Sequence, residues 1–457
     1  MDRYLTVFSL KPKDGSTADS AVQDFSVKDL TRIYKGPELL MNAPSLGVLA
    51  QHCVALDTTR ADRRVIFVFD EPLERDKFYT CLKILRMSAV GGTGRVGGST
   101  ARWLRKLAEE EKLEDFELAV AGRSRENYAQ FAQRWPGEEC GAAPQFVEID
   151  HTNRDSIREV LNARDWDLLV HTAGPFQGIQ RPLLLEEALK SGTPYVDVCD
   201  DTELCKTAKE LCPELEEAKV PAVVSAGIWP GVSALMVCEA VERLGGSAED
   251  VEMCFYTAGT GGAGPTIVSA TFLLLAEPPL NFKDGREVRA EPWGNRRLVD
   301  FGRNVGRQHV HLLDEPEVYT CHRCLGIPNI TSSFGTAPDV WNLMFGAVRI
   351  LPKSVLGNRG LMQGVANFSM PIISAVDRLV GATNAMRVDA RSETGEAVTL
   401  RITHSDLEDC VGLATAAFGL EVLQGQVPPG AWFPAEMAAN RARIFQRVRH
   451  GSINWEM

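Results

Sequence analysis

Residues 88–107 read SAVGGTGRVGGSTARWLRKL, and this stretch decides the fold. Gly92, Gly94 and Gly97 within it satisfy the spacing GxGxxG. Residues 84–90 before the glycines read as a strand, and an amphipathic helix is expected to follow them. The order strand, glycine turn, helix predicts the start of a parallel α/β sheet.

A glycine turn in this setting is suited to a pyrophosphate. The first glycine permits a tight turn, the second lets the backbone approach the phosphates, and the third brings the helix close to the strand. The anion would then lie at the helix N-terminus, where N–H groups lack partners. A purely structural turn is the alternative interpretation. The residues expected to contact a dinucleotide here are Gly92, Thr93, Gly94, Arg95, Val96 and Gly97.

The alternation of strands and helices continues to residue 227. Apolar strands are expected at residues 117–121, within QFVEID, DLLVHTAGPF and YVDVCDD, and in PAVVSAG, with helices between them, one of them at residues 207–219. We therefore expect a Rossmann doubly wound parallel sheet over residues 87–227.

The residues that follow the second strand indicate which dinucleotide is bound. A carboxylate there would accept hydrogen bonds from a ribose 2′-hydroxyl, whereas an arginine pairs with a 2′-phosphate. This chain has Arg123 and Ser124 at that point, which favours NADP over NAD, although Arg123 could also be a solvated side chain at a strand end. Two later strand ends are expected beside the cofactor: Asp150 near the adenine, unless it caps the next helix, and Ala173, Gly174 and Pro175 near the nicotinamide ribose.

Residues 1–86 have a different pattern. Short alternating segments, RYLTVFSL and RVIFVF, precede a segment in which Phe78, Leu82 and Leu85 recur at helical spacing. This predicts a small N-terminal β-rich extension closed by a helix. Its last third weakly resembles the end of a pleckstrin-homology-like domain, and an extension that packs on an enzyme without a function of its own is the alternative.

Composition limits the classes of protein. The chain has 457 residues, 44% of them hydrophobic and 24% charged, which indicates several buried cores. Forty-nine basic against 61 acidic residues give a net charge of −12, and no basic block is present, so nucleic acid is not an expected partner. Eleven scattered cysteines, an N-terminus without a signal-peptide pattern and the lack of a long apolar run predict a cytoplasmic protein.

Several motifs together resemble the saccharopine dehydrogenase-like NADP-dependent oxidoreductases. They are GGTGRVGG, AGRS, HTAGPFQ, YVDVCDD and AGIWPGVS, followed by GTGGAGPTIVSATFLLLAEP, PNITSSFGTAPDVWN and VPPGAWFPAE. The resemblance implies a second α/β substrate domain of mostly antiparallel sheet over residues 228–400, which could also carry a dimer interface, and a segment 401–457 that returns to the Rossmann domain. It further implies hydride exchange between NADP(H) and a small-molecule amine or imine. Carbonyl substrates, and a scaffold or redox sensor that binds NADP(H) without turnover, remain alternatives.

Proton transfer needs a group near the nicotinamide, and the carboxyl ends of parallel strands border that site. His171 ends the fourth strand, and Asp197, Asp200 and Asp201 follow the fifth. Each also has a structural interpretation, as a backbone hydrogen-bonding partner or a helix cap.

Three further stretches allow more than one interpretation. Residues 256–266, YTAGTGGAGPT, could cradle a substrate carboxylate or form a plain turn. Donors in HVH and CHRC are closely spaced but lack a second CxxC pair, so we expect no metal site. Residues 341–381 are rich in apolar and basic residues; burial at a domain or homodimer interface is favoured, and contact with a membrane or lipid droplet is the alternative. The metal donors considered are His309, His311, Cys321, His322 and Cys324.

Overall fold

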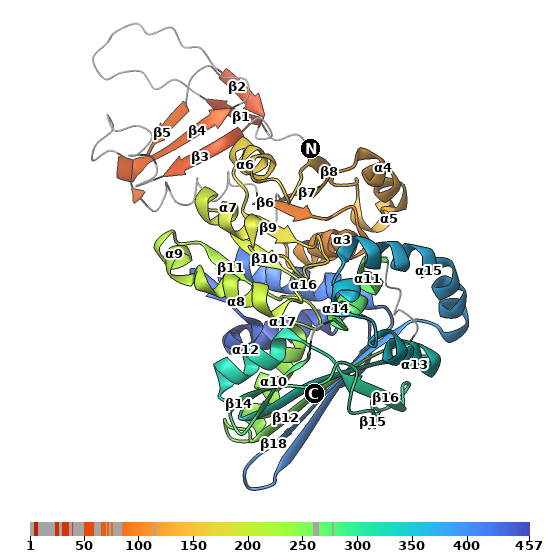
Figure 1. Cartoon of the computed structure of the whole chain (residues 1–457). Helices are drawn as coiled ribbons and strands as arrows, with labels where there is room; N and C mark the ends of the chain where they lie inside the picture. Colours follow the sequence, from red (N-terminus) through yellow and green to blue (C-terminus); the bar gives the residue numbers. More distant parts are fainter. Residues whose placement is uncertain are drawn as a thin grey trace, which may run out of the picture. The chain divides into compact units, whose positions relative to one another are not determined.

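The computed structural model divides the chain into two compact units, residues 1–85 with 162–165, and the remainder (Figure 1). Each unit is described by itself. The structure describes residues 4–7, 23–26, 30–35, 39, 50–58, 65–69, 71–72, 75, 85–113, 116–258, 265–276 and 278–457.

The first unit contains two small antiparallel sheets, as the N-terminal pattern predicted. One pairs β1 (Tyr4–Val7) with β2 (Gln23–Ser26), and the other has the order β3 (Leu30–Lys35), β4 (Cys53–Thr58), β5 (Val65–Val68). The expected closing helix falls mostly outside the described residues, and Leu85, which was assigned to it, instead begins the strand β6 (Leu85–Val90). The pleckstrin-homology-like resemblance and the domain boundaries stay predictions.

A seven-stranded parallel sheet is the first layer of the second unit. Its order is β20-β11-β10-β9-β6-β7-β8, so the chain reverses direction across the sheet next to β6, as in a doubly wound fold. The strands are β6 (Leu85–Val90), β7 (Phe116–Gly122), β8 (Gln145–Glu148), β9 (Leu168–His171), β10 (Tyr195–Asp197), β11 (Pro221–Val223) and β20 (Gly430–Trp432).

Helices cover both faces of this sheet. Consecutive strand residues point to opposite sides, so each buried strand contributes apolar side chains to both helix layers. Leu168 and Val170 join a core with α3 and α16, whereas Leu169 joins a second core with α6, α7 and α8. Every one of these strand side chains is buried, which explains their apolar runs. The helices are α3 (Arg95–Glu110), α4 (Arg125–Arg134), α5 (Gly137–Cys140), α6 (Arg154–Ala163), α7 (Leu183–Ser191), α8 (Thr202–Glu210), α9 (Cys212–Glu217) and α16 (Leu407–Leu423).

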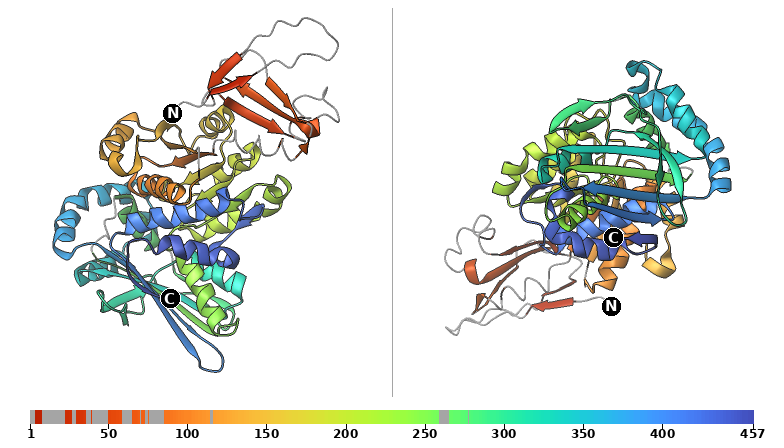
Figure 2. Two further views of the ribbon diagram at one scale, coloured as in Figure 1. Left: turned by 180° about the vertical axis from the view of Figure 1, so that it is seen from behind. Right: turned by 90° about the horizontal axis from the view of Figure 1, so that it is seen from below.

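A second, mixed sheet follows, with its strands side by side in the right-hand view of Figure 2. Its order is β14-β13-β17-β12-β18-β19-β21, and β15 and β16 join through β17; only the β12–β17 pair is parallel. The strands are β12 (Asp250–Ala258), β13 (Leu280–Lys283), β14 (Arg286–Arg289), β15 (Arg297–Asp300), β16 (Arg307–Leu312), β17 (Asn329–Ala337), β18 (Thr383–Arg391), β19 (Ala397–His404) and β21 (Ser452–Glu456). The mostly antiparallel second sheet is thus confirmed.

Helices cover one face of the second sheet. They are α10 (Val232–Arg243), α11 (Pro265–Leu274), α12 (Pro316–Leu325), α13 (Asp339–Val348), α14 (Lys353–Leu356) and α15 (Arg359–Val380). On α13 and α15, Phe345 and Ile373 face inward, but the outer side is also apolar: Leu343 is 64% and Phe368 84% exposed. Burial of residues 341–381 at a domain or homodimer interface stays a prediction, with a membrane or lipid surface as the alternative.

The C-terminal segment joins both sheets. β20 extends the parallel sheet beside β11, and β21 pairs with β19 of the mixed sheet. α16 lies against α3, and α17 (Arg441–Val448) packs on α16. Two short 3₁₀ turns, Pro434–Glu436 and Ala438–Asn440, connect β20 to α17.

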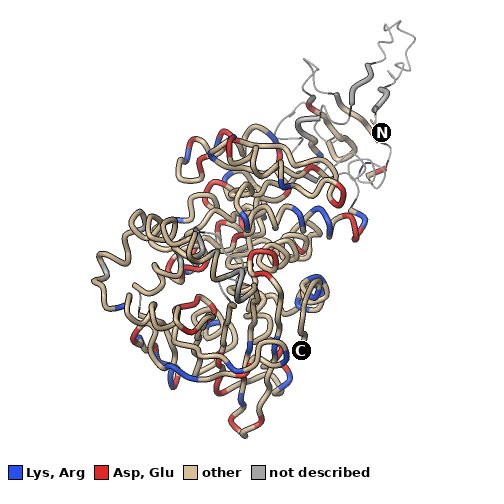
Figure 3. Tube along the Cα trace, turned by 90° about the vertical axis from the view of Figure 1, so that its right-hand side faces the viewer, with Lys and Arg blue, Asp and Glu red and all other residues tan. Residues whose placement is uncertain are grey.

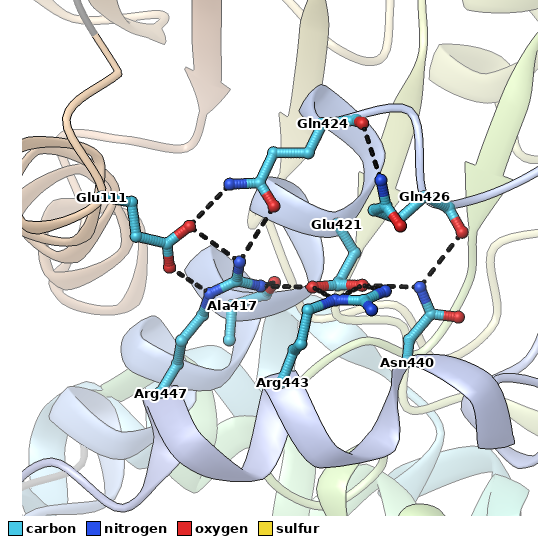
Figure 4. A network of polar contacts seen from close by, with 8 residues as sticks. All are labelled: Glu111, Ala417, Glu421, Gln424, Gln426, Asn440, Arg443 and Arg447. Atoms are coloured by element: carbon cyan, nitrogen blue, oxygen red, sulfur yellow. Dashed lines mark hydrogen bonds and ion pairs between the residues drawn. The ribbon is translucent and has the colours of Figure 1, made fainter.

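A buried network of ion pairs and hydrogen bonds connects α3, α16 and α17 (Figure 4). The carboxylate of Glu421 is fully buried and accepts hydrogen bonds from Arg443, Arg447 and Asn440. Arg447 also donates to Glu111, at the end of α3. Hydrogen bonds to the charged form therefore satisfy this carboxylate on several sides.

Charges of both signs are interspersed along the described trace (Figure 3). Among the described helices, none combines the length and the apolar character that a membrane crossing needs.

Candidate cofactor and active site

A cavity of about 800 Å³ lies at the carboxyl ends of β6, β7, β9 and β10. This is the edge of a doubly wound sheet at which ligands bind. The residues that line it are Val90, Gly91, Thr93, Gly94, Arg95, Val96, Gly97, Gly122, Arg123, Ser124, Asn127, His151, Thr172, Ala173, Gly174, Pro175, Phe176, Val198, Asp200, Trp229, Pro230, Leu407, Glu408 and Val411.

The glycine loop forms one wall of the cavity. Gly91 has φ +81°, a conformation that favours glycine, and a Cβ at this position would lie 2.8 Å from the backbone nitrogen of Ala173. A Cβ on Gly97 would lie 2.6 Å from Oγ1 of Thr172. Gly94 lines the cavity and is the N-cap of α3, with its own N–H donated to the carbonyl of Gly91. Glycine at these positions keeps the backbone close together and leaves the helix N-terminus open to the cavity, which is the cradle that a pyrophosphate needs.

At the end of β7 the two residues expected to select the cofactor have different roles. The hydroxyl of Ser124 caps α4 by accepting a hydrogen bond from the N–H of Asn127 at 3.2 Å. Arg123 is exposed at the cavity wall, and no ion pair involves it among the described residues. Of the two, Arg123 is the side chain that is available to a phosphate.

At the end of the cavity away from Arg123, the lining residues are small or apolar, with the exception of Asp200. Ala173, Gly174 and Pro175 line it as expected, and Trp229 and Pro230, which precede α10, line it as well. The sole candidate acid that lines the cavity is Asp200. Of the four candidate proton donors that the sequence places at strand ends, the structure brings Asp200 alone to the cavity.

Asp200 is half-buried and lies close to several other acidic residues. Burial and the neighbouring charge of Asp201 raise its pKa to about 7, against hydrogen bonding from Gln177. Its Oδ1 has no partner among the described groups. Glu315 and Glu317, both 1% exposed, contribute to the same electrostatic environment; burial raises the pKa of Glu317 to about 7 and that of Glu315 well above its usual range. Burial and neighbouring acids therefore both favour the protonated form of Asp200.

His171 and Asp197 lie behind the cavity wall. Nδ1 of His171 is 2.9 Å from the hydroxyl of Tyr195, and burial lowers the imidazole pKa to about 3, so the ring is neutral. Asp197 accepts hydrogen bonds from the N–H groups of Cys199 and Ser225, and burial raises its pKa to about 6. Both residues support the β9 and β10 ends that carry the cavity wall.

Three other predicted residues also have structural contacts and do not line the cavity. Asp201 is the N-cap of α8, accepting from the N–H of Leu204 at 2.8 Å. Asp150 accepts from the N–H and hydroxyl of Thr152, and these hydrogen bonds lower its pKa. Gly92 is packed beneath the loop, where a Cβ would lie 2.8 Å from that of Val120.

Sequence reasoning missed the contribution of α16. Leu407, Glu408 and Val411 line the cavity from its first turns. Glu408 pairs with Arg95, one of the residues expected to contact a dinucleotide. No motif marks these positions, because their proximity to the loop arises from tertiary packing. His151 and Asn127 were missed as well, although each follows a predicted strand end closely in the sequence.

Among the described residues, no group of three His, Cys, Asp or Glu side chains is arranged to hold a metal. CHRC lies on helix α12, where Cys321 is buried and His322 stacks on Phe282 with ring centroids 3.6 Å apart. His311 stacks on Trp293. Most of the second glycine cluster, residues 259–264, lies outside the described residues.

No protein-family model and no curated protein matches the chain. Among solved structures, saccharopine dehydrogenase (L-Glu forming) from Saccharomyces cerevisiae is similar over 80% of this chain and 98% of its own, with a TM-score of 0.53 and 15% identity. A meso-DAP dehydrogenase variant from Clostridium tetani covers 78% of this chain and 95% of its own, at TM-score 0.37 and 11% identity. GenD2 from gentamicin A biosynthesis, in complex with NAD, covers 82% of this chain and 97% of its own, at TM-score 0.36 and 15% identity. The architecture and the first of these comparisons agree: the chain has a saccharopine dehydrogenase-like fold.

Proposed function

We propose that the protein is an NADP(H)-dependent oxidoreductase that transfers a hydride to or from an imine, amine or carbonyl compound. The observation that carries this proposal is the 800 Å³ cavity, which has a glycine-loop cradle on one wall, Arg123 at one end and Asp200 at the other. The dehydrogenases of similar fold support the reaction class.

The residues present fit a nicotinamide dinucleotide. The first turn of α3 would hold the pyrophosphate, and Arg123 would pair with a 2′-phosphate. Ala173, Gly174 and Pro175 leave room for the nicotinamide ribose at the far end. When bound, the nicotinamide supplies or accepts the hydride.

Asp200 supplies the proton in this proposal. In the reducing direction its protonated carboxyl donates to the substrate nitrogen or oxygen, and in the oxidising direction its carboxylate accepts that proton. A pKa of about 7 leaves both forms populated at neutral pH. Apolar neighbours, Trp229 and Leu407 among them, keep water from the reacting atoms.

Two measurements test the proposal. Fluorescence titration should show that NADPH binds more tightly than NADH. NADPH consumption should then appear with members of a panel of imines, aldehydes and ketones. Equal affinity for the two cofactors contradicts NADP selectivity, and tight binding without turnover across the panel favours a scaffold or redox sensor instead.

A further inference from the structure

A second, smaller cavity of about 80 Å³ adjoins the cofactor cavity. The two share Trp229 and Leu407 in their linings. The smaller one lies between the mixed sheet and the helices α11, α13 and α15. Its further lining residues are Thr257, Val268, Thr271, Phe272, Phe334, Thr336, Trp341, Met344, Phe345, Ser369 and Ile373.

The chemistry of this lining is apolar. No charged side chain is among the described residues that line the cavity, and their polar side-chain groups are hydroxyls and the indole N–H groups of Trp229 and Trp341. Oγ1 of Thr257 is 3.4 Å from Oγ1 of Thr336, and the hydroxyl of Ser369 donates to the carbonyl of Val365 within its own helix. A carboxylate placed here would lose its hydration without gaining a cation, which costs several kcal/mol.

The walls of the smaller cavity are fixed by packing and hydrogen bonds. Phe272 and Phe345 meet edge to face with centroids 5.8 Å apart. The side-chain amide of Asn342 donates to the carbonyl of Thr336 and accepts from its N–H, which ties the start of α13 to β17. The cavity is therefore a preformed site.

Trp229 forms the boundary between the two cavities. Its indole stacks on Phe255 at a centroid distance of 5.0 Å, and its N–H donates to Oδ1 of Asn384. Because the ring is held on one face and at one edge, its position where the apolar cavity meets the cofactor cavity is fixed.

We propose that the smaller cavity selects substrates that carry a compact, uncharged apolar group next to the reacting C=O or C=N carbon. Its volume is well below the roughly 150 Å³ of an apolar protein cavity that binds benzene, so the group is a short branched alkyl chain, smaller than an aromatic ring. The carbon that exchanges hydride then lies at the Trp229 boundary, within the cofactor cavity. This inference rests on the proposed function for its reaction, but the cavity binds its ligand irrespective of turnover.

Methyl isoamyl ketone and levulinate provide a matched pair of probes. They share a methyl ketone and a two-carbon spacer, and differ in carrying an isopropyl group or a carboxylate at the far end. Saturation-transfer NMR on the full chain loaded with NADP⁺ measures binding without turnover. The ketone should bind at least about tenfold more tightly than levulinate, since only its apolar end avoids the cost of desolvating a charge.

Ser369→Trp fills the cavity and should abolish ketone binding while NADPH affinity stays unchanged. Phe368→Trp is the matched control, because residue 368 is on the same helix, is 84% exposed and does not line the cavity. Ser369→Leu serves as a milder filling variant, and NADPH affinity reports that each variant is folded.

The possible outcomes distinguish the apolar substrate site from the proposed oxidoreductase function. Equal binding of the two probes, or ketone binding that survives both filling variants, overturns the apolar site. Ketone binding that is blocked by filling in a protein that does not bind NADPH supports the site and contradicts the proposed function. NADPH binding without ketone binding overturns the inference alone.

Discussion

At the residue scale, Arg123 and Ser124 occupy adjacent positions but only Arg123 is available to a ligand. Arg123→Ala should therefore remove most of the preference for NADPH, a loss of about 1.5 to 3 kcal/mol for a charged hydrogen-bonded contact, and leave NADH affinity nearly unchanged. Fluorescence titration with both cofactors measures this difference. Arg125→Ala is the control, because Arg125 is paired with Glu148; a larger effect of the control than of Arg123→Ala would contradict the assignment.

A second prediction concerns Asp200. Its raised pKa, about 7, means that the protonated form prevails below neutrality. The rate of reduction, measured as kcat/KM, should be highest at low pH and fall as the pH rises through about 7, and the rate of oxidation should change in the opposite direction. Asp200→Asn should lower turnover by roughly 10²- to 10⁴-fold and flatten this profile, with NADPH affinity nearly unchanged. A variant that keeps the wild-type profile would exclude Asp200 as the proton donor.

At the element scale, the close approach of α16 to α3 depends on Gly412. A Cβ at this position would lie 2.6 Å from the backbone nitrogen of Thr100, which cannot move aside as a side chain can. Gly412→Ala should push α16 away, displace Leu407, Glu408 and Val411 from the cavity, and weaken NADPH binding. Titration measures the effect.

Gly419→Ala in the same helix is the matched control for this prediction. A Cβ there would meet only the ends of two leucine side chains, the nearer at 3.1 Å. Equal NADPH affinity in the two variants would show that the close approach of α16 to α3 does not determine cofactor binding.

The elements of the parallel sheet were predictable because local patterns specify them. Each strand is a short apolar run, and the glycine loop marks the first turn. The single helix expected at residues 207–219 is instead two, α8 and α9, because Pro213 lacks an N–H and begins a new helix.

The candidate site was predictable only in part. Strand ends gave four candidate acids and bases, but the sequence does not say which of them faces a cavity; that depends on caps and on packing behind the strands, as for Asp201 and His171. The contribution of α16 had no local signal at all, since Asp409 meets Ser99 across 310 residues of sequence.

At the scale of the whole molecule, the network around Glu421 joins three helices. Burial alone would raise the pKa of Glu421, but hydrogen bonds from Arg443, Asn440 and Arg447 outweigh it and lower the pKa. Glu421→Gln removes the buried charge that Arg443 and Arg447 share and leaves Arg447 with Glu111 as its remaining charge partner. This change should cost about 3 to 5 kcal/mol in the free energy of unfolding, measured with denaturant. Glu242→Gln, which breaks a pair with Arg441 in which the Glu242 carboxylate is exposed, should destabilise the protein much less.

The same pair of variants gives a pH dependence. Because the folded-state pKa of Glu421 is lowered, its contribution is present above the ordinary glutamate pKa of about 4.3 and is lost as the pH falls through the folded value. Glu421→Gln should therefore lose less stability on acidification than the parent protein. If Glu421→Gln and the parent protein lost equal stability on acidification, other titrating groups would dominate the pH dependence.

The division of the chain into two units also makes a prediction. β6 lies in the middle of the parallel sheet, so a chain that begins at Asp76 keeps every described strand of that sheet. Its NADPH affinity should stay within about twofold of the full chain, as expected for a separable domain. Failure of this shorter chain to fold would assign the N-terminal segment to the enzyme core.

The contact between Asp409 and Ser99 has a consequence for biosynthesis. The glycine loop leaves the ribosome long before α16, and β20 and β21 are translated later still. The nascent chain can therefore assemble single βα units, but neither sheet is complete and the cofactor cavity lacks one wall until the last helices emerge. We therefore expect the cavity to bind a dinucleotide only after α16 has left the ribosome, because Leu407, Glu408 and Val411 of that helix complete its lining.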